Sequence, residues 1–267
     1  MARSKQAGVS RVIAIANQKG GAGKTTVAVN LAVAMGETAH RVLLVDVDPQ
    51  ADASTMLGVD PGAHDRTIYD VFTGGCEIPG AIARHAAPGV DLVIGTERMA
   101  DIELTLAGQM MRERYLAEAL REHVDSYDVV LIDCPPNLGL LTVNALVAAD
   151  EALIVLSMID RNAYKGAMAL LETMGELRRK GVEINLAAIL RNNVDRSRQT
   201  YRVLNDALAK TELPIMDAEI PMRAEFQNAL TAGQPLLLRN PDHIGAQALR
   251  NAAAELLGDA RSRRRAA

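Results

Sequence analysis

The chain has very few aromatic residues and no tryptophan, since only 3% of its 267 residues are Phe, Tyr or Trp. Because 49% of the residues are still hydrophobic, we expect a core built from Ala, Val, Leu, Ile and Met. Cysteine is also scarce: Cys76 and Cys134 lie far apart and show no metal-ligand spacing, and the five histidines are not paired. This composition argues against a disulfide framework or a His/Cys metal site, and it favours a reducing, cytoplasmic compartment.

Long apolar segments are missing as well. No hydrophobic run is long enough to span a bilayer, and the first eight residues contain no apolar signal core. After Leu257 the chain has arginines without bulky apolar neighbours, whereas a membrane-binding amphipathic helix needs both. We therefore expect no membrane partner.

A glycine-rich segment at residues 17–26 is the most informative feature. An ordinary phosphate-binding loop, Gly-x-x-x-x-Gly-Lys-Ser/Thr, would need glycine at the position of Gln18. The chain instead reads Lys-Gly-Gly-Ala-Gly-Lys-Thr, with Lys19 ahead of the glycines. Backbone N–H groups of such a loop, together with a helix N-terminus, hold phosphate. We predict nucleotide contacts from Gly20, Gly21, Ala22, Gly23, Lys24, Thr25 and Thr26, with the Thr25 hydroxyl on Mg²⁺.

Strand-like and helix-like segments alternate along the chain, which predicts an α/β fold: a single doubly wound, mostly parallel sheet with helices on both faces. Strands are expected at residues 12–16, 41–48, 90–96, 128–133, 152–157, 184–191 and 214–220. Helices are expected at residues 25–35, 102–124, 140–149, 163–180, 199–210, 223–232 and 244–257. We expect one domain over residues 11–258, a flexible basic N-terminus at 1–10 and a basic disordered tail at 259–267.

Acidic residues follow two of the expected strands. Ligands of open parallel sheets bind beyond the carboxyl ends of the strands, so these acids should lie near the loop. Asp133 is expected to hold Mg²⁺ through its water shell. Asp46 and Asp48 share one face of their strand, and one of them could orient water near the γ-phosphate.

Three segments together resemble one family. Residues 17–26, 42–54 and 131–146 are similar to the motifs of the ParA/Soj partition ATPases, and the similarity extends from about residue 11 to 257. The resemblance implies a deviant P-loop ATPase that forms an ATP-dependent homodimer face to face around two ATP molecules. It also implies non-specific binding of duplex DNA on the nucleoid, and stimulation by a ParB-type centromere-binding protein.

The same resemblance implies residue roles. Lys24 would be the P-loop lysine, Thr25 the magnesium ligand, and Lys19 the lysine that reaches the partner's phosphates. Asp48 would orient the hydrolytic water, with Asp46 and Asp133 near the metal shell. The adenine would be framed by Asn192 or Asn193 and by Ile220 with Pro221. Residues 191–195 and 156–158 depart from the family pattern.

Positive charge concentrates late in the chain despite a net charge of −4. Between residues 178 and 210 there are eight Lys or Arg and three Asp or Glu, a local balance of +5. Such a face suits the phosphate backbone of duplex DNA, and the scarcity of aromatics disfavours stacking on single strands. The candidate DNA contacts are Arg191, Arg196, Arg198, Arg202 and Arg223.

Three other functions are alternatives to DNA partition. A positioning ATPase that moves a protein cargo on the nucleoid would have the same motifs. A MinD-like membrane ATPase needs a C-terminal amphipathic anchor, and an iron–sulfur reductase needs two cysteines beyond the nucleotide site. The sequence favours the partition ATPase and leaves the cargo open.

Overall fold

The computed structural model describes residues 10–258, so the expected basic tail and all but Ser10 of the expected N-terminal segment lie outside the described residues. Within that range the chain forms an eight-stranded sheet in the order β3-β4-β2-β5-β1-β6-β7-β8. Neighbouring strands are parallel except β3 and β4, which are antiparallel. The strands are β1 (Arg11–Ala16), β2 (Val42–Asp46), β3 (Ile82–Ala87), β4 (Val90–Val93), β5 (Val129–Asp133), β6 (Glu151–Ser157), β7 (Asn185–Val194) and β8 (Ile215–Pro221).

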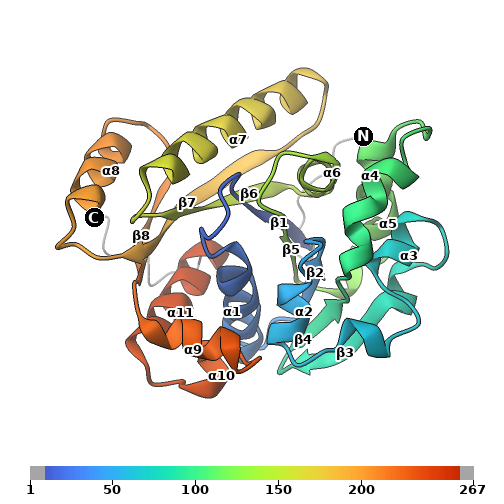
Figure 1. Ribbon diagram of the computed structural model, residues 1–267, viewed down its shortest axis with the longest axis horizontal. Coiled ribbons are helices and arrows are strands. Elements are labelled where there is room, and N and C mark those ends of the chain that lie inside the picture. The colour runs from blue at the N-terminus through green and yellow to red at the C-terminus, as the bar shows by residue number, and fades with distance from the viewer. Residues whose placement is uncertain (1–9, 259–267) are drawn as a thin grey trace.

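Helices cover both faces of this sheet, as the doubly wound fold class predicts (Figure 1). Helices α6, α7 and α8 lie on one side, while α1, α9, α10 and α11 lie on the other. The helices are α1 (Lys24–Glu37), α2 (Asp52–Met56), α3 (Ile68–Phe72), α4 (Ile102–Thr105), α5 (Tyr115–Leu120), α6 (Leu140–Ala148), α7 (Arg161–Arg179), α8 (Gln199–Ala209), α9 (Ala224–Thr231), α10 (Leu236–Arg239) and α11 (Ile244–Leu257). Among residues 10–258 no helix combines the length and the apolar character needed to cross a membrane.

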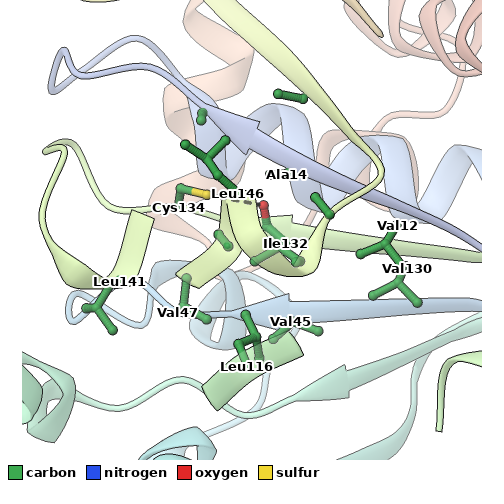
Figure 2. Packing of buried hydrophobic residues seen from close by; sticks show 14 of the residues in the cluster. Val12, Ala14, Val45, Val47, Leu116, Val130, Ile132, Cys134, Leu141 and Leu146 are labelled. Carbon is green, nitrogen blue, oxygen red and sulfur yellow. Dashed lines mark hydrogen bonds between the residues drawn. The ribbon is translucent and has the colours of Figure 1, made fainter. Parts of the chain in front are cut away.

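Two aliphatic cores form because successive side chains of a strand point to opposite faces. On β1, Val12 and Ala14 pack in the core beneath α5–α8, whereas Ile13 and Ile15 pack beneath α1, α10 and α11. Figure 2 shows part of the first core, where Leu146 of α6 lies over the ends of β1 and β5. Strand β1 is apolar from Val12 to Ala16 because it is a central strand that is buried on both faces.

One predicted helix is wrong. Residues 102–124 do not form a continuous helix, because α4 ends at Thr105 and α5 begins only at Tyr115. Gly108, a poor helix former, and Met111, whose left-handed conformation (φ 54°) does not propagate a helix, lie between them. Strand β3 and the short helices α2, α3 and α10 were not predicted. β3 is a partly exposed edge strand, so it lacks the buried apolar run of the central strands.

The sheet topology puts the glycine loop at a crevice. Strand β1 lies between β5 and β6. The strands that follow β1 in the chain first fill one side of the sheet, with β2 to β5, and then the other, with β6 to β8, so the strand order switches direction at β1. Ligands of open α/β sheets bind at such a switch point, beyond the carboxyl ends of the strands. The loop between β1 and α1, residues 17–23, lies there.

Candidate functional site

The glycine loop borders a cavity of about 590 Å³. Its lining includes Gly20, Gly21, Gly23, Lys24, Thr25 and Thr26 from the loop and α1, and Asp48 from the loop after β2. A larger hollow of about 1080 Å³ lies between β8 and α11, and none of its lining residues belongs to the glycine loop. The smaller cavity is the candidate site, because the glycines, the lysine and an acid converge there.

Two glycines within the loop and one glycine packed against it are required by the local geometry. Gly21 and Gly23 have φ values of 73° and 84°, which other residues rarely adopt. Gly166 of α7 approaches the start of the loop so closely that a Cβ there would lie 2.7 Å from Oδ1 of Asn17. The Asn17 amide donates to the carbonyl of Val155 at 2.8 Å, and its oxygen accepts the N–H of Lys19 at 3.1 Å. Asn17 therefore ties the loop to β6 and α7, a role that the sequence did not reveal.

Lys24 begins α1 and is only 5% exposed. Burial lowers its pKa, and the nearby carboxylate of Asp133 acts in the opposite direction. Its Nζ lies 3.5 Å from the carbonyl oxygen of Lys19, so the ammonium group is held under the loop. A buried ammonium with weak protein partners is well suited to bind phosphate oxygens.

Asp46 and Asp133 face each other in register on β2 and β5 and are completely buried. Burial raises the pKa of Asp46 to about 7, although Ser54 donates both its hydroxyl and its backbone N–H to Oδ2. Burial and the neighbouring Asp46 also raise the pKa of Asp133, while Thr25 and Lys24 oppose the rise. Within residues 10–258, neither oxygen of Asp133 has a hydrogen-bond partner of ordinary geometry.

These unpaired oxygens fit a hard cation. Mg²⁺ prefers carboxylate, hydroxyl and water oxygens, and Asp133 lies close enough to Thr25 for the hydroxyl to influence its pKa. Neither Asp46 nor Asp133 lines the cavity. Asp48 does line it, is 7% exposed, and accepts the N–H of Gln50 at 3.0 Å through Oδ1.

Lys19 differs from Lys24 in exposure. Its side chain is 43% exposed, and its Nζ lies 3.4 Å from Oδ2 of Asp160. Asp160 also accepts the N–H of Asn162 at 2.8 Å and so caps the N-terminus of α7. In the single chain, Lys19 is therefore held at the rim of the site by an ion pair within its own subunit.

The residues predicted to frame adenine separate into two groups. Asn192, Asn193 and Ile220 line the loop cavity, whereas Pro221 lines the larger hollow between β8 and α11. The Asn192 amide donates to the carbonyl of Ala22 at 2.7 Å. Side chains of α9 that the sequence did not single out complete the wall: Phe226, Gln227 and Leu230. The sequence signal that could have identified these three residues was their position on the helix that follows the predicted Ile220–Pro221 pair.

The candidate DNA arginines also differ from one another. Arg191 is 15% exposed, and its guanidinium bonds Glu219, Asn205 and the carbonyl of Met216, so its charge is taken up inside the protein. Arg196 pairs with Glu219, and Arg198 pairs with Asp195. Arg202 and Arg223 are exposed, and among residues 10–258 neither has an acidic partner within ion-pair distance.

A glycine loop between a buried strand and a helix, a buried lysine at its end and acids on neighbouring strands define a P-loop nucleotide-binding protein. Comparison with known proteins identifies the family within this class. The family described as AAA domain matches residues 10–188. The chain is 36% identical to the chromosome partitioning protein ParA of Caulobacter vibrioides, over 95% of this chain and 96% of that protein. The chain belongs to the ParA/Soj family of P-loop ATPases.

Other similarities agree with this assignment. The sporulation initiation inhibitor protein Soj of Bacillus subtilis is 31% identical over 93% of this chain and 98% of its own. Among solved structures, the cell division ATPase MinD of Pyrococcus furiosus has a TM-score of 0.77 and 28% identity, covering 94% of this chain and 99% of its own. Cobyrinic acid a,c-diamide synthase of Mycobacterium smegmatis, with a bound ATP analogue and magnesium, has a TM-score of 0.82 and 33% identity, covering 93% of this chain and 94% of its own.

Proposed function

We propose that this chain is a DNA partition ATPase that binds Mg-ATP in the loop cavity and forms an ATP-dependent dimer. The observation that carries the proposal is the pairing of a buried lysine, Lys24, with an exposed lysine, Lys19, on either side of one glycine loop. One lysine is held inside the site, and the other lies at its rim where a second subunit could be reached. Similarity to ParA of Caulobacter vibrioides over almost the whole chain supports the same function.

Each residue has a part in the proposed reaction. Lys24 and the loop N–H groups bind the β- and γ-phosphates, and Thr25 with Asp46 and Asp133 would hold Mg²⁺ directly or through water. When bound, Mg²⁺ would neutralise charge that develops on the phosphoryl oxygens. Asp48 orients the attacking water, because its carboxylate lines the cavity.

Dimerisation would make hydrolysis conditional on assembly. Lys19 leaves Asp160 and reaches the phosphates of the partner subunit, where it stabilises the same developing charge. The ATP-bound dimer then holds nucleoid DNA through exposed arginines, and a ParB-type protein bound to the cargo stimulates hydrolysis and release. The ATP analogue and magnesium found with the Mycobacterium smegmatis synthase support the choice of ligands.

Two variants test the proposal. Lys24→Ala should weaken ATP binding by about 100-fold, since it removes a buried charge-assisted contact to phosphate. Asp48→Ala should retain ATP binding and DNA co-sedimentation but slow hydrolysis by about 100-fold or more. ATP titration and phosphate release measure the two effects. Wild-type hydrolysis by Asp48→Ala would remove the water-orienting role, and ATP-independent DNA binding by the wild type would refute the partition function.

A further inference from the structure

The two segments that depart from the ParA/Soj pattern lie against each other at the site. Ser157 at the end of β6 is in register with Asn192 of β7, and the N–H of Met158 donates to the Asn192 carbonyl at 2.8 Å. The Asn193 amide donates to the hydroxyl of Ser157 at 3.3 Å. These bonds fix the backbone of Asn192 beside the glycine loop.

The side chain of Asn192 is then aimed at the loop. Asn192 is only 6% exposed, and its Nδ2 donates to the carbonyl of Ala22 at 2.7 Å. Ala22 is completely buried, so its carbonyl depends on a protein donor. Gly23 must lack a side chain for this contact to exist, because a Cβ there would collide with the Asn192 amide. The loop and the asparagine are complementary in shape and in hydrogen bonding.

We propose that Asn192 is a positioning residue that holds the glycine loop in its phosphate-binding conformation. A trans peptide is planar, and its C=O and N–H groups point in opposite directions. Holding the Ala22 carbonyl therefore fixes the N–H of Gly23, one of the donors that the loop offers to phosphate. This role differs from the adenine contact predicted for Asn192, and it rests on the proposed function only in requiring that the loop bind phosphate.

Two neighbouring asparagines provide a matched experiment. Asn192→Asp and Asn193→Asp add the same charge to the lining of the same cavity. At position 192 a carboxylate would replace the donor that faces the Ala22 carbonyl, whereas at 193 the Ser157 hydroxyl can donate to the new carboxylate. Both variants and the wild type are titrated with Mg-ATP and with Mg-tripolyphosphate, which has no base, by displacement of a fluorescent ATP analogue.

Asn192→Asp should weaken binding of both ligands by about tenfold or more, because a buried acceptor loses its donor and faces a second acceptor. Asn193→Asp should weaken both affinities several-fold less than Asn192→Asp does, because it adds the same charge to the cavity but its hydrogen bond is retained. The midpoint of thermal unfolding without ligand is measured for each. If Asn192→Asp is unfolded, Asn192→Ala takes its place with the same expected direction.

Three results would overturn the inference: unchanged affinities, equal losses in both aspartate variants, or a loss for ATP alone, which would restore the adenine contact. ATP hydrolysis and DNA co-sedimentation by the wild type test the proposed function separately. Their failure would leave the tripolyphosphate comparison intact, so the two hypotheses fail in distinguishable ways.

Discussion

At the residue scale, the role proposed for Lys19 requires that its ion pair with Asp160 be exchanged for a contact across a dimer. We predict that Lys19→Ala changes ATP affinity by no more than about fivefold, because an exposed ion pair contributes only about 1 kcal/mol or less. The same variant should lose ATP-dependent dimerisation, hydrolysis or both, since the second subunit's phosphates lose their lysine.

Analytical ultracentrifugation with and without ATP, together with phosphate release, measures these effects. Lys180→Ala is a control, since Lys180 is an exposed lysine at the end of α7, and it should behave as the wild type. Dimers and hydrolysis at wild-type levels in Lys19→Ala would contradict the role in trans.

Part of the site was predictable residue by residue. Lys24, Thr25 and Asp48 were predicted from a glycine loop after a strand and from acids at strand ends, and all three line the loop cavity. Asp133 was predicted in the same way but does not line the cavity, and the chemical roles of all four stay predictions. The contacts of Asn17 and Asn192 with the loop were not predictable, since their partners lie 138 and 170 residues away in the sequence. The burial of Arg191 against Glu219 was missed for the same reason.

At the element scale, β8 is the edge of the sheet, and α11 covers part of that edge. The pairing of β7 with β8 is irregular, and two successive N–H groups of β8 turn away from the ladder. Glu255 of α11 accepts both, from Asp217 at 2.8 Å and from Ala218 at 3.0 Å. The Glu255 carboxylate therefore accepts two hydrogen bonds that a further strand would accept at this edge of the sheet.

Removing this carboxylate should loosen α11 from the sheet. We predict that Glu255→Ala lowers the free energy of unfolding by about 1–2 kcal/mol, because two partly exposed N–H groups lose a charged acceptor. Glu255→Gln keeps one amide oxygen as acceptor and should lose less. Urea unfolding followed by circular dichroism gives both values. Equal stability of all three proteins would show that water replaces the carboxylate without cost.

The β3–β4 hairpin at the opposite edge has its own acidic anchor. Burial acts to raise the pKa of Asp91, but hydrogen bonds from the His85 N–H, Arg84 and Tyr127 outweigh it, so the pKa is lowered. A carboxyl with a lowered pKa in the folded state stabilises the protein above its ordinary pKa of 3.8. This contribution is lost as the pH falls below about 4 and through the folded value.

Asp91→Asn should therefore cost about 1 kcal/mol at pH 7, a small value because the Arg84 side chain is 57% exposed. Between pH 7 and pH 3 the wild type should lose more stability than the variant. Unfolding free energies at the two pH values measure the difference. Identical losses in both proteins would mean that the Asp91 hydrogen bonds are equally strong in the protonated form.

Elements with a strong hydrophobic periodicity were predicted well, whereas the break in residues 102–124 and the edge strand β3 were not. Helix α11 has the predicted bounds because its apolar residues recur at helical spacing and Gly258 ends it. The break near Gly108 was missed because the surrounding residues favour a helix individually. Strand β3 depends on pairing with β4 along the outer edge of the sheet, a context that local sequence does not contain.

At the scale of the whole molecule, the basic stretch from residue 178 to 210 is less uniform than its composition suggests. Charge counted along the chain ignores ion pairs, and the structure pairs Arg191 and Arg196 with one acid, Glu219. Of the five candidate arginines, the two that are exposed and have no ion-pair partner within residues 10–258 are Arg202 on α8 and Arg223 before α9. Figure 1 shows α8 and α9 at the same end of the molecule, away from α4 and α5.

We therefore predict an order among double variants in ATP-dependent binding to duplex DNA. Arg202→Ala with Arg223→Ala should weaken binding most and reduce the slope of log affinity against log salt by about 2, because two unpaired cations no longer displace counterions. Arg196→Ala with Arg198→Ala should have a smaller effect, since those guanidinium groups are already engaged by Glu219 and Asp195.

The control removes equal charge from the other end of the sheet, at Arg112 and Arg114 beside α5. It should leave the salt slope unchanged, because α5, which these arginines directly precede, lies away from α8 and α9 (Figure 1). Fluorescence anisotropy at several salt concentrations, with ATP and the Asp48→Ala background to prevent hydrolysis, measures all the slopes. If the three double variants give the same slope, the protein holds DNA through its overall field or another surface, and the arginines of α8 and α9 carry no particular role.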